Sequence, residues 1–196
     1  MAHYFENDDK IKTNEKKIKN FINNKEFSFY VDNGIFSKKG LDFGTRSLLE
    51  KIEKLDIKGE MLDLGCGYGP IGIYIASTTK SNVDMIDINE KALYLAEKNK
   101  KLNGVDVNVF ESNIYENINK KYDYIITNPP IRVGKEILYK ILFGAQKYLK
   151  KEGSLIFVIH KDQGAKTLMK RLEEVYEVQL LGKNKGFYII SSKTLD

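Results

Sequence analysis

The sequence predicts an α/β fold in which a mostly parallel sheet lies between two layers of helices. From residue 60 onward, short apolar segments alternate with amphipathic ones, which is typical of right-handed strand-helix-strand crossovers. The last two apolar segments are instead joined by a very short connection. At 196 residues the chain is long enough for one compact domain with a substantial core. We therefore expect a single structural domain over residues 45–196, preceded by an N-terminal arm and hairpin over residues 1–44.

The N-terminal segment is predicted to carry a small hairpin. Residues 1–20 are polar and rich in lysine, which favours a loosely held arm with a short helix. Apolar residues at 27–31 and 35–37 flank Asp32-Asn33-Gly34, and Asn-Gly supplies the positive φ angles of a tight turn. Thr45 is then expected to be a helix N-cap, because leucine and isoleucine recur after it at helical spacing.

The remaining elements follow from hydrophobic periodicity. Strands are predicted at 60–64, 83–88, 105–110, 122–127 and 154–160, and helices at 70–78, 89–103, 135–150 and 163–174. Two further strands, 176–182 and 186–192, are separated only by Lys183-Asn184-Lys185. A connection this short cannot form a parallel crossover, so the last strand of the seven should run antiparallel.

The composition limits the possible binding partners and the cellular compartment of the protein. A net charge of +5 and a pI near 9.0 favour a polyanionic partner such as RNA, although the basic residues are nearly all lysines, with arginine only at positions 46, 132 and 171. No apolar run approaches the length of a membrane span, and residues 1–20 are charged where a signal peptide has its apolar core. We therefore expect a cytoplasmic protein that does not bind membranes.

A structural metal site is not expected. The single cysteine, Cys66, excludes an internal disulfide and a multi-cysteine metal site, and His3 and His160 are far apart in the sequence. His160 ends a predicted strand, where a packed or hydrogen-bonded role is favoured over a catalytic one.

A glycine-rich segment follows the strand predicted at 60–64. Ligands of open parallel sheets bind at the carboxyl ends of strands, and glycines there allow close approach of the backbone to a ligand. In Asp63-Leu64-Gly65-Cys66-Gly67 the glycines precede Pro70, which suits the first turn of the next helix. Asp87 lies about 20 residues further on at the end of the next strand, where a carboxylate accepts hydrogen bonds from both ribose hydroxyls.

The same segment contains an accidental dinucleotide motif. Gly67, Gly69 and Gly72 spell G-x-G-x-x-G, which would indicate a nicotinamide or flavin nucleotide. In that motif the first glycine follows the strand directly, whereas Asp63 to Cys66 intervene here and the carboxylate would repel a pyrophosphate. S-adenosylmethionine has no phosphate and carries an ammonium, so the segment favours this cofactor. A dinucleotide site and an ordinary tight turn are the alternatives, and Cys66 is interpreted as a small loop residue.

The Asn-Pro-Pro segment after the strand at 122–127 predicts the type of acceptor. If the Asn128 side-chain oxygen and the Pro129 carbonyl each accept an N–H, the lone pair of a planar amine turns toward a methyl donor. Pro129 and Pro130 fix φ and stiffen that geometry. Asn-Pro is also common in simple turns, which is the alternative. Methylation of a pyrimidine carbon is disfavoured, because it needs a cysteine nucleophile and Cys66 lies in the other motif.

Together, LDLGCGYGPIG, Asp87 and Asn128-Pro129-Pro130 resemble the Rossmann-like (class I) S-adenosylmethionine-dependent methyltransferases, whose seven-stranded sheet has an antiparallel last strand. The resemblance implies a three-layer sandwich in which the glycine loop surrounds the methionine, Asp87 holds the ribose, Ile88 packs on adenine and Asn113 faces its amino edge. The cofactor-binding residues that it implies are Asp63, Gly65, Cys66, Gly67, Asp87, Ile88, Asn113, Ile114 and Asn128.

The residues around position 131 narrow the substrate by resemblance. Adenine-amine and protein-glutamine methyltransferases of this pattern usually have an aromatic residue there, whereas this chain has Ile131 followed by Arg132. Together with residues 36–45 and the closing Lys185-Gly186-Phe187-Tyr188, this segment resembles the small-subunit (16S) ribosomal RNA guanine-N(2)-methyltransferases. Well-known members carry a second, degenerate domain for which this chain has no room. The resemblance is therefore to the single-domain relatives. The catalytic residues implied are Asn128, Pro129, Pro130 and Ile131, and the substrate-binding residues are Arg132, Lys135, Phe36 and Thr45.

The sequence thus predicts transfer of a methyl group to guanine N2 in small-subunit ribosomal RNA, or in its assembly particle, by a monomer. The alternatives are an adenine-amine or protein-glutamine methyltransferase, and a noncatalytic RNA-binding or assembly module. The intact Asn128-Pro129-Pro130 argues against the last alternative, because a binding module has no need of those acceptors.

Overall fold

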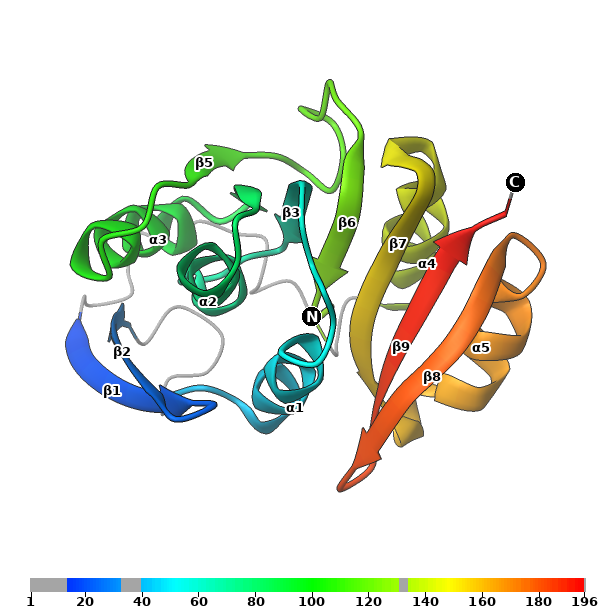
Figure 1. Cartoon of the computed structure of the whole chain (residues 1–196), viewed down its shortest axis with the longest axis horizontal. Coiled ribbons are helices and arrows are strands. Elements are labelled where there is room, and N and C mark those ends of the chain that lie inside the picture. The colour runs from blue at the N-terminus through cyan, green and yellow to red at the C-terminus, as the bar shows by residue number, and fades with distance from the viewer. Residues whose placement is uncertain (1–13, 33–39, 131–133, 196) are drawn as a thin grey trace.

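The fold is built on a seven-stranded sheet with the order β5-β4-β3-β6-β7-β9-β8 (Figure 1). The structure is a computed structural model that describes residues 14–32, 40–130 and 134–195. Neighbours from β5 to β7 pair in parallel, whereas β9 runs antiparallel to both β7 and β8. The predicted fold class and the antiparallel last strand are therefore confirmed. The strands are β3 (Glu60–Leu64), β4 (Asn82–Asp87), β5 (Asn108–Glu111), β6 (Tyr122–Thr127), β7 (Leu149–His160), β8 (Tyr176–Asn184) and β9 (Phe187–Thr194).

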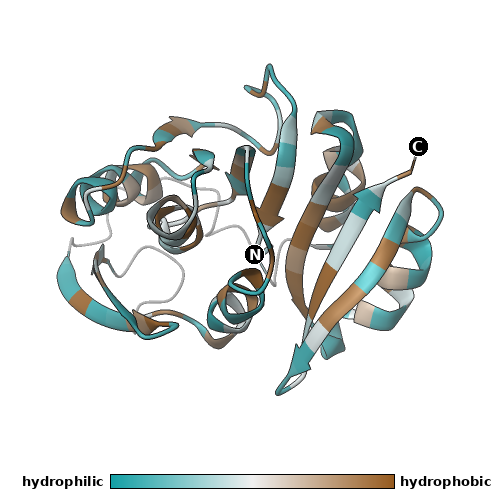
Figure 2. Cartoon of the chain, viewed as in Figure 1, coloured by the Kyte–Doolittle hydropathy of each residue, from teal (hydrophilic) through white to brown (hydrophobic). Residues whose placement is uncertain are grey.

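Helices cover both faces of the sheet and enclose two cores. Along β7, Leu155 and Phe157 face one core while Ile156 and Val158 face the other, because successive side chains of a strand alternate between faces. In Figure 1, α4 and α5 lie behind β7, β9 and β8, and Figure 2 shows that the later part of β7 is apolar whereas its beginning is polar. The first core is covered by α1 (Phe43–Ile52), α2 (Pro70–Thr78) and α3 (Glu90–Leu102), and the second by α4 (Gly134–Gly144) and α5 (Ala165–Leu172).

The N-terminal hairpin differs from the predicted one. Its strands are β1 (Lys16–Ile22) and β2 (Lys25–Val31), and the turn between them is Asn23-Asn24, with φ angles of 48° and 64°. Asparagine tolerates the left-handed region that such a turn requires. The arm with a short helix expected over residues 1–20 is therefore wrong at 16–20, which form a strand. The other expected strand, 35–37, and its turn at Asn33-Gly34 lie outside the described residues.

Two asparagines, Asn99 on α3 and Asn103 at its C-cap, join this hairpin to the main domain. Asn99 is buried; its Oδ1 accepts the Tyr30 N–H at 2.6 Å, and its Nδ2 donates to the carbonyls of Tyr30 and Tyr68. Asn103 bonds the N–H and carbonyl of Ser28 in the same way. These side chains satisfy the open edge of β2 and tie it to the glycine-rich loop that contains Tyr68.

Several predicted boundaries shift. Helix α1 begins at Phe43, and its N-cap is Asp42, whose Oδ1 accepts the Thr45 N–H at 3.0 Å, so Thr45 is not the cap. The helix predicted to continue to residue 150 ends earlier, in the 3-10 turn η1 (Ala145–Tyr148), because β7 already begins at Leu149. A second 3-10 turn, η2 (Lys161–Gln163), follows β7. In the part of the chain that the structure describes, no helix is both long and apolar enough to cross a membrane.

Candidate active site

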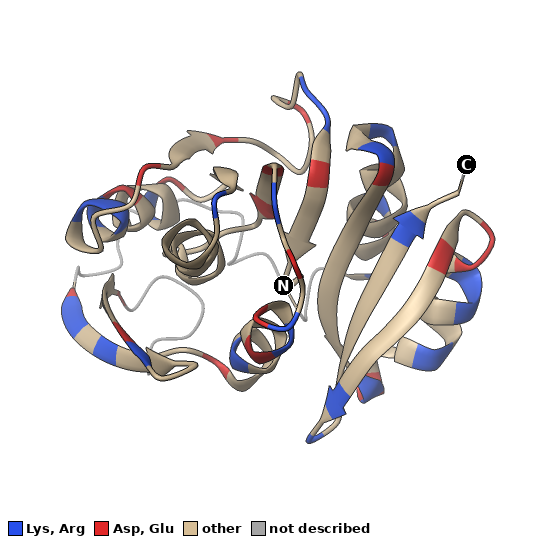
Figure 3. Ribbon diagram, viewed as in Figure 1, with Lys and Arg blue, Asp and Glu red and all other residues tan. Residues whose placement is uncertain are grey.

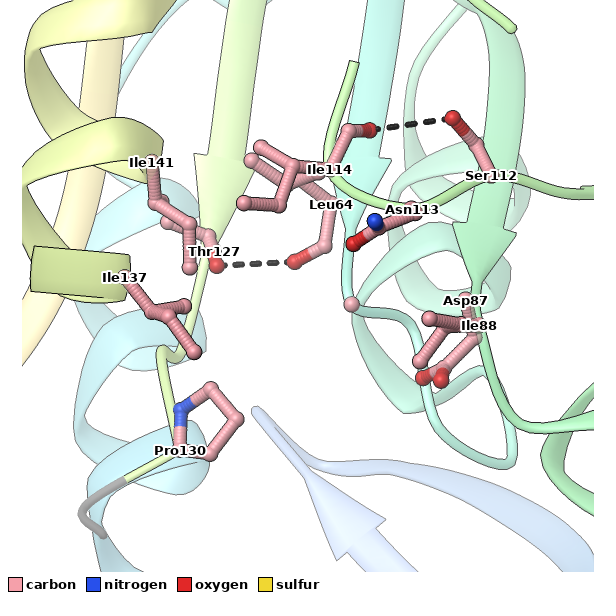
Figure 4. A pocket seen from close by; sticks show the side chains of 11 residues that line it. Leu64, Asp87, Ile88, Ser112, Asn113, Ile114, Thr127, Pro130, Ile137 and Ile141 are labelled. Carbon is pink, nitrogen blue, oxygen red and sulfur yellow. Dashed lines mark hydrogen bonds between the residues drawn. The ribbon is translucent and has the colours of Figure 1, made fainter. Parts of the chain in front are cut away.

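The two motifs emerge side by side at the carboxyl edge of the sheet. Strands β3 and β6 are neighbours in the sheet, and the Thr127 hydroxyl at the end of β6 donates a 2.7 Å hydrogen bond to the Leu64 carbonyl at the end of β3 (Figure 4). The chain passes from β3 to β4 on one side and later returns to β6 on the other. The motifs therefore flank the point where the strand order reverses, which is where open α/β sheets bind ligands.

The first two glycines of the loop leave room for a ligand. Gly65 and Gly67 have φ angles of 72° and 57°, and a Cβ added at either would meet no described atom within 4 Å. The Gly67 N–H donates to Asp87 Oδ2 at 2.9 Å and the Cys66 N–H donates to the Ile86 carbonyl at 2.8 Å. These donors bond the next strand, so they are not directed at a phosphate.

Gly72 of the same loop has a packing role. A Cβ at Gly72 would lie 2.4 Å from the sulfur of Met85, which is completely buried, so the glycine lets α2 approach β4 closely. The third glycine of the G-x-G-x-x-G pattern is thus explained by packing, without a dinucleotide.

Asp63 is a buried carboxylate with one oxygen that lacks a partner. Its Oδ2 accepts the Gly72 N–H at 2.8 Å, whereas its Oδ1 has no hydrogen-bond partner among the described residues. Burial raises the pKa of Asp63 to about 7; the Gly72 N–H opposes this rise and the charge of Asp87 adds to it. A buried acceptor of this kind suits the ammonium group of S-adenosylmethionine and repels a phosphate.

A pocket beside the loop has the chemistry of an adenosine site. Figure 4 shows Ile137 and Pro130 on one side of it and Asp87 and Ile88 on the other. Apolar side chains offer packing surfaces for a purine, and a carboxylate accepts from ribose hydroxyls. The pocket is lined by Leu64, Gly65, Asp87, Ile88, Ser112, Asn113, Ile114, Thr127, Pro130, Ile137 and Ile141.

Two polar side chains of this pocket, Asp87 and Asn113, keep acceptor capacity. Asp87 is buried, which raises its pKa, and its two oxygens accept the N–H groups of Gly67 and Asn89, leaving further lone pairs on each. Asn113 donates its amide hydrogen to Glu116 at 2.9 Å, so its own Oδ1 faces away from that carboxylate and can accept from an exocyclic amine.

Ile114 holds an unusual backbone conformation at the pocket. Its φ of 55° lies in the left-handed region, which costs a β-branched residue about 1–2 kcal/mol. The Ser112 hydroxyl compensates by donating to the Ile114 carbonyl at 3.1 Å (Figure 4), and it also accepts the Asn117 N–H. Strain of this kind at a pocket is consistent with a role in placing the side chain there.

Asn128, the first residue after β6, has a fixed amide orientation. Its Nδ2 donates to Asp42 Oδ1 at 3.2 Å and to Thr45 Oγ1 at 2.9 Å. A carboxylate only accepts hydrogen bonds, so the group facing Asp42 must be the NH₂ and not the oxygen. Both amide hydrogens are therefore held by α1 and its cap, which leaves Oδ1 as the acceptor for a substrate.

The other expected site residues lie as follows. Pro129 is buried and Lys135 is exposed in the first turn of α4. Cys66 is buried, which raises the pKa of its thiol well above the usual range and keeps it protonated, unlike a nucleophile. Thr45 is 3% exposed and contacts Asn128 instead of opening to a substrate. The remaining three, Phe36, Ile131 and Arg132, lie outside the described residues.

Aromatic residues form a rim next to this site that sequence reasoning did not assign. The Phe187 ring at the start of β9 lies 5.8 Å from that of Phe43 and 4.9 Å from that of His160, and Lys185 Nζ lies 5.0 Å from the Phe43 centroid. His160 is thus packed against an aromatic ring. Asp42 was likewise missed as a site residue; its position just before a helix was the available signal.

Comparison with known proteins shows which family the chain resembles. The model of a family described as "Methyltransferase small domain" matches residues 26–191. An uncharacterized Bacillus subtilis protein, YbxB, is 40% identical over 196 residues, covering 97% of this chain and 98% of that protein. A Colwellia psychrerythraea protein named ribosomal RNA small subunit methyltransferase C is 32% identical over 161 residues, covering 80% of this chain and 44% of that protein. A Vibrio vulnificus protein of the same name is 39% identical over 130 residues, covering 64% and 38%. This chain therefore spans less than half the length of these two relatives.

Solved structures share the fold. A T. thermophilus 16S rRNA N2 methyltransferase, solved in complex with AdoMet and guanosine, has a TM-score of 0.83 at 21% identity, covering 92% of this chain and 51% of that one. A ribosomal protein L11 methylase from Lactobacillus delbrueckii has a TM-score of 0.68 at 23% identity, covering 77% and 78%. At these identities the likeness establishes the fold alone. Because the family model matches most of the sequence, the chain belongs to the methyltransferase small domain family.

Proposed function

We propose that this protein transfers a methyl group from S-adenosylmethionine to the exocyclic N2 of a guanine in small-subunit ribosomal RNA. The observation that carries the proposal is the orientation of Asn128. Its two amide hydrogens are bound by Asp42 and Thr45, so its oxygen is left to accept from an amine. Asn128 directly follows β6, the strand next to the one that leads into the glycine-rich loop, and it lies beside a pocket with the chemistry of an adenosine site.

Different residues of the pocket bind different parts of the cofactor. Asp87 accepts from the ribose hydroxyls, Ile88 and Ile114 pack on the purine, and Asn113 Oδ1 accepts from its amino group. The open backbone at Gly65, with Gly67, receives the methionine part, whose ammonium is balanced by the buried acidic groups of the loop. When bound, the cofactor supplies an electrophilic methyl group.

The chain's own residues orient and polarise the acceptor. A guanine amine is a poor nucleophile, since its lone pair is delocalised into the ring. Asn128 Oδ1 and the Pro129 carbonyl each accept one N–H, which favours a pyramidal nitrogen with its lone pair aimed at the methyl group. The same oxygens stabilise the positive charge that develops on nitrogen. The methylated amine then loses a proton to water, so no strong base is required, and the protonated Cys66 takes no part.

RNA as the substrate class is supported by charge and by relatives. The chain has a net charge of +5, and two relatives of 32% and 39% identity are named as small-subunit ribosomal RNA methyltransferases. The target base must be unpaired or flipped to reach Asn128. The protein then acts in the cytoplasm, as a monomer, on ribosomal RNA or an assembly particle. Methylation of an adenine amine or a protein glutamine is the second candidate, because Asn-Pro-Pro also suits those planar amines.

Labelled methyl transfer tests the proposal. Naked ribosomal RNA, small subunits, whole ribosomes and transfer RNA are each incubated with labelled S-adenosylmethionine, and the products are digested to nucleosides. We expect N2-methylguanosine in small-subunit RNA only, and none with Asn128→Ala, which should still bind the cofactor. Label confined to transfer RNA or protein would refute the ribosomal assignment, and near wild-type transfer by Asn128→Ala would refute the role of Asn128.

A further inference from the structure

We propose that Asp42 and Thr45 are positioning residues that lock the Asn128 amide with its oxygen toward the acceptor amine. The inference rests on the proposed function and extends it to a helix cap that is distant in sequence. Asp42 and Asn128 are 86 residues apart in the chain, yet their side chains are 3.2 Å apart.

The direction of the hydrogen bonds determines which end of the amide faces the substrate. Asn128 Nδ2 donates one hydrogen to Asp42 Oδ1 and the other to Thr45 Oγ1, at 3.2 and 2.9 Å. If the amide turned over, its oxygen would face a carboxylate that has no hydrogen to donate. The contact with Asp42 therefore selects one of the two amide orientations, and that orientation leaves Oδ1 for the amine. The negative charge behind the NH₂ group also polarises the amide and strengthens Oδ1 as an acceptor.

The cap that holds Asn128 is itself rigid. Asp42 Oδ1 also accepts the Thr45 N–H at 3.0 Å and so begins α1. A Cβ at the intervening Gly44 would lie 3.1 Å from Asp42 Oδ1 and 3.0 Å from the Phe187 ring, so the turn is closely packed. Helix α1 is anchored in the core by Leu48, Leu49 and Ile52, which are at most 2% exposed. Asn128 is thus braced by a buried helix as well as by its own strand.

Loss of either contact affects chemistry more than binding. Without the Asp42 oxygen the amide samples both orientations, because the Thr45 hydroxyl can donate as well as accept, and the NH₂ group then meets the N–H groups of the acceptor amine. Without the Thr45 hydroxyl one amide hydrogen loses its acceptor, and the amide is held at one point only. Cofactor contacts at Asp87, Ile88 and Asn113 lie on other strand ends and are not changed. The expected signature is a fall in kcat at unchanged cofactor affinity, because the oriented acceptor acts chiefly on the transition state.

The test compares variants at each of the two contacts. Thr45→Val keeps the shape of the side chain and removes the acceptor, and Thr45→Ser restores a hydroxyl. Asp42→Ala removes the oxygen that accepts from Asn128 together with the N-cap; Asp42→Asn would keep both bonds, because the same Oδ1 accepts them. Ser47→Ala is the matched control, because Ser47 lies on the same helix, is buried, and accepts a hydrogen bond from Asn184 that does not involve Asn128. Thermal unfolding shows that each variant is folded.

Three readouts are measured. In methyl transfer at saturating RNA and cofactor, we expect kcat to fall about 10- to 100-fold in Thr45→Val and Asp42→Ala, and Thr45→Ser and Ser47→Ala to stay within about threefold of wild type. Calorimetry should show S-adenosylhomocysteine affinity within about threefold throughout. By NMR, the Asn128 side-chain amide protons, assigned by their loss in Asn128→Ala, should exchange with water at least about tenfold faster in Thr45→Val.

The outcomes separate this inference from the proposed function. Unchanged amide exchange in Thr45→Val, or unchanged kcat in both Thr45→Val and Asp42→Ala, would overturn the inference. A parallel loss of kcat and cofactor affinity that Thr45→Ser does not restore would indicate a purely structural role and would also overturn it. Failure of wild-type protein to methylate any RNA would contradict the proposed function, while the NMR measurement, which needs no substrate, would still decide the positioning role.

Discussion

The backbone N–H of Gly67 donates a 2.9 Å hydrogen bond to the carboxylate of Asp87, so the glycine-rich loop and the end of the neighbouring strand form one unit. In dinucleotide-binding folds the corresponding loop directs its N–H groups at a pyrophosphate. Here the buried acids Asp63 and Asp87 both lie at the loop, and they would repel a phosphate. The same geometry leaves Asp87 able to accept from hydroxyl groups.

Removal of the Asp87 carboxylate should weaken cofactor binding strongly. In Asp87→Ala, the two charge-assisted hydrogen bonds proposed to ribose are lost at about 1.5–3 kcal/mol each, which predicts at least about a hundredfold weaker affinity for S-adenosylhomocysteine by calorimetry. Glu111→Gln is the control, since Glu111 pairs with Asp87 in the sheet register but does not line the pocket. Wild-type affinity in Asp87→Ala, or tight binding of NAD by the unmodified protein, would contradict the cofactor assignment.

The parallel core was predictable because its signal is local, whereas the N-terminal hairpin was not. Each buried strand is a short apolar run, and each helix begins at a recognisable signal such as Pro70. In β1, by contrast, Lys17, Lys19 and Phe21 point outward. Because most of the outward residues are lysines, the alternation of exposed and buried residues that marks a strand was not recognised in the sequence. The position of the hairpin also depends on a tertiary contact, because Asn99 on α3 forms hydrogen bonds with the open edge of β2.

The site was predictable only in part for a similar reason. The glycine loop and Asn128 can be recognised from their residue types, because they follow predicted strands at the ends where ligands bind. The support of Asn128 by Asp42 is a contact between segments 86 residues apart, and no local pattern encodes it. Asp42 has the character of a helix cap in the sequence, and its second role appears only when α1 is placed against β6.

The raised pKa of Asp63 predicts a specific dependence of stability on pH. Its folded value of about 7 exceeds the unfolded value of 3.8, so the folded protein binds this proton more tightly. The free energy of unfolding should therefore fall as pH rises from about 4 to 7, by at most about 1.4 kcal/mol per pH unit, and level off above that range. Urea unfolding at pH 5 and pH 8 measures this difference.

The matched variant for this prediction is Asp63→Asn. It keeps an oxygen that can accept the Gly72 N–H and removes the titration. The stability lost between pH 5 and pH 8 should be smaller in the variant by about 2–4 kcal/mol, of the order expected for a fully buried carboxyl. Asp87, whose pKa burial also raises, contributes in the same direction in both proteins. An identical pH difference in wild type and variant would show that Asp63 is ionised in the folded state.

Gly72→Ala should destabilise the fold through overpacking. The added methyl group would lie 2.4 Å from the sulfur of Met85 and 3.2 Å from Asp63 Oδ2, and Met85 has no exposed surface into which to move. Such overpacking costs about 1–3 kcal/mol. Urea unfolding of Gly72→Ala, Met85→Ala and the double variant measures the coupling, and the double variant should be more stable than the sum of the single effects predicts. Strict additivity would contradict the packing role of Gly72.

Lys185 should contribute to RNA binding from the tip of the β8–β9 hairpin. Figure 3 shows basic residues at this tip, and strand pairing places it beside His160 at the carboxyl edge of the sheet, with Lys185 above the Phe43 ring next to Asp42. A phosphate contact there predicts that Lys185→Ala raises KM for RNA about 3- to 10-fold and lowers the slope of log affinity against log salt by about one unit, at unchanged cofactor affinity. Lys80→Ala is the control, because exposed Lys80 precedes β4 at the opposite edge of the sheet. If both variants changed RNA affinity equally, the effect would come from total charge. That result would contradict the prediction that the carboxyl edge of the sheet is the RNA-binding face.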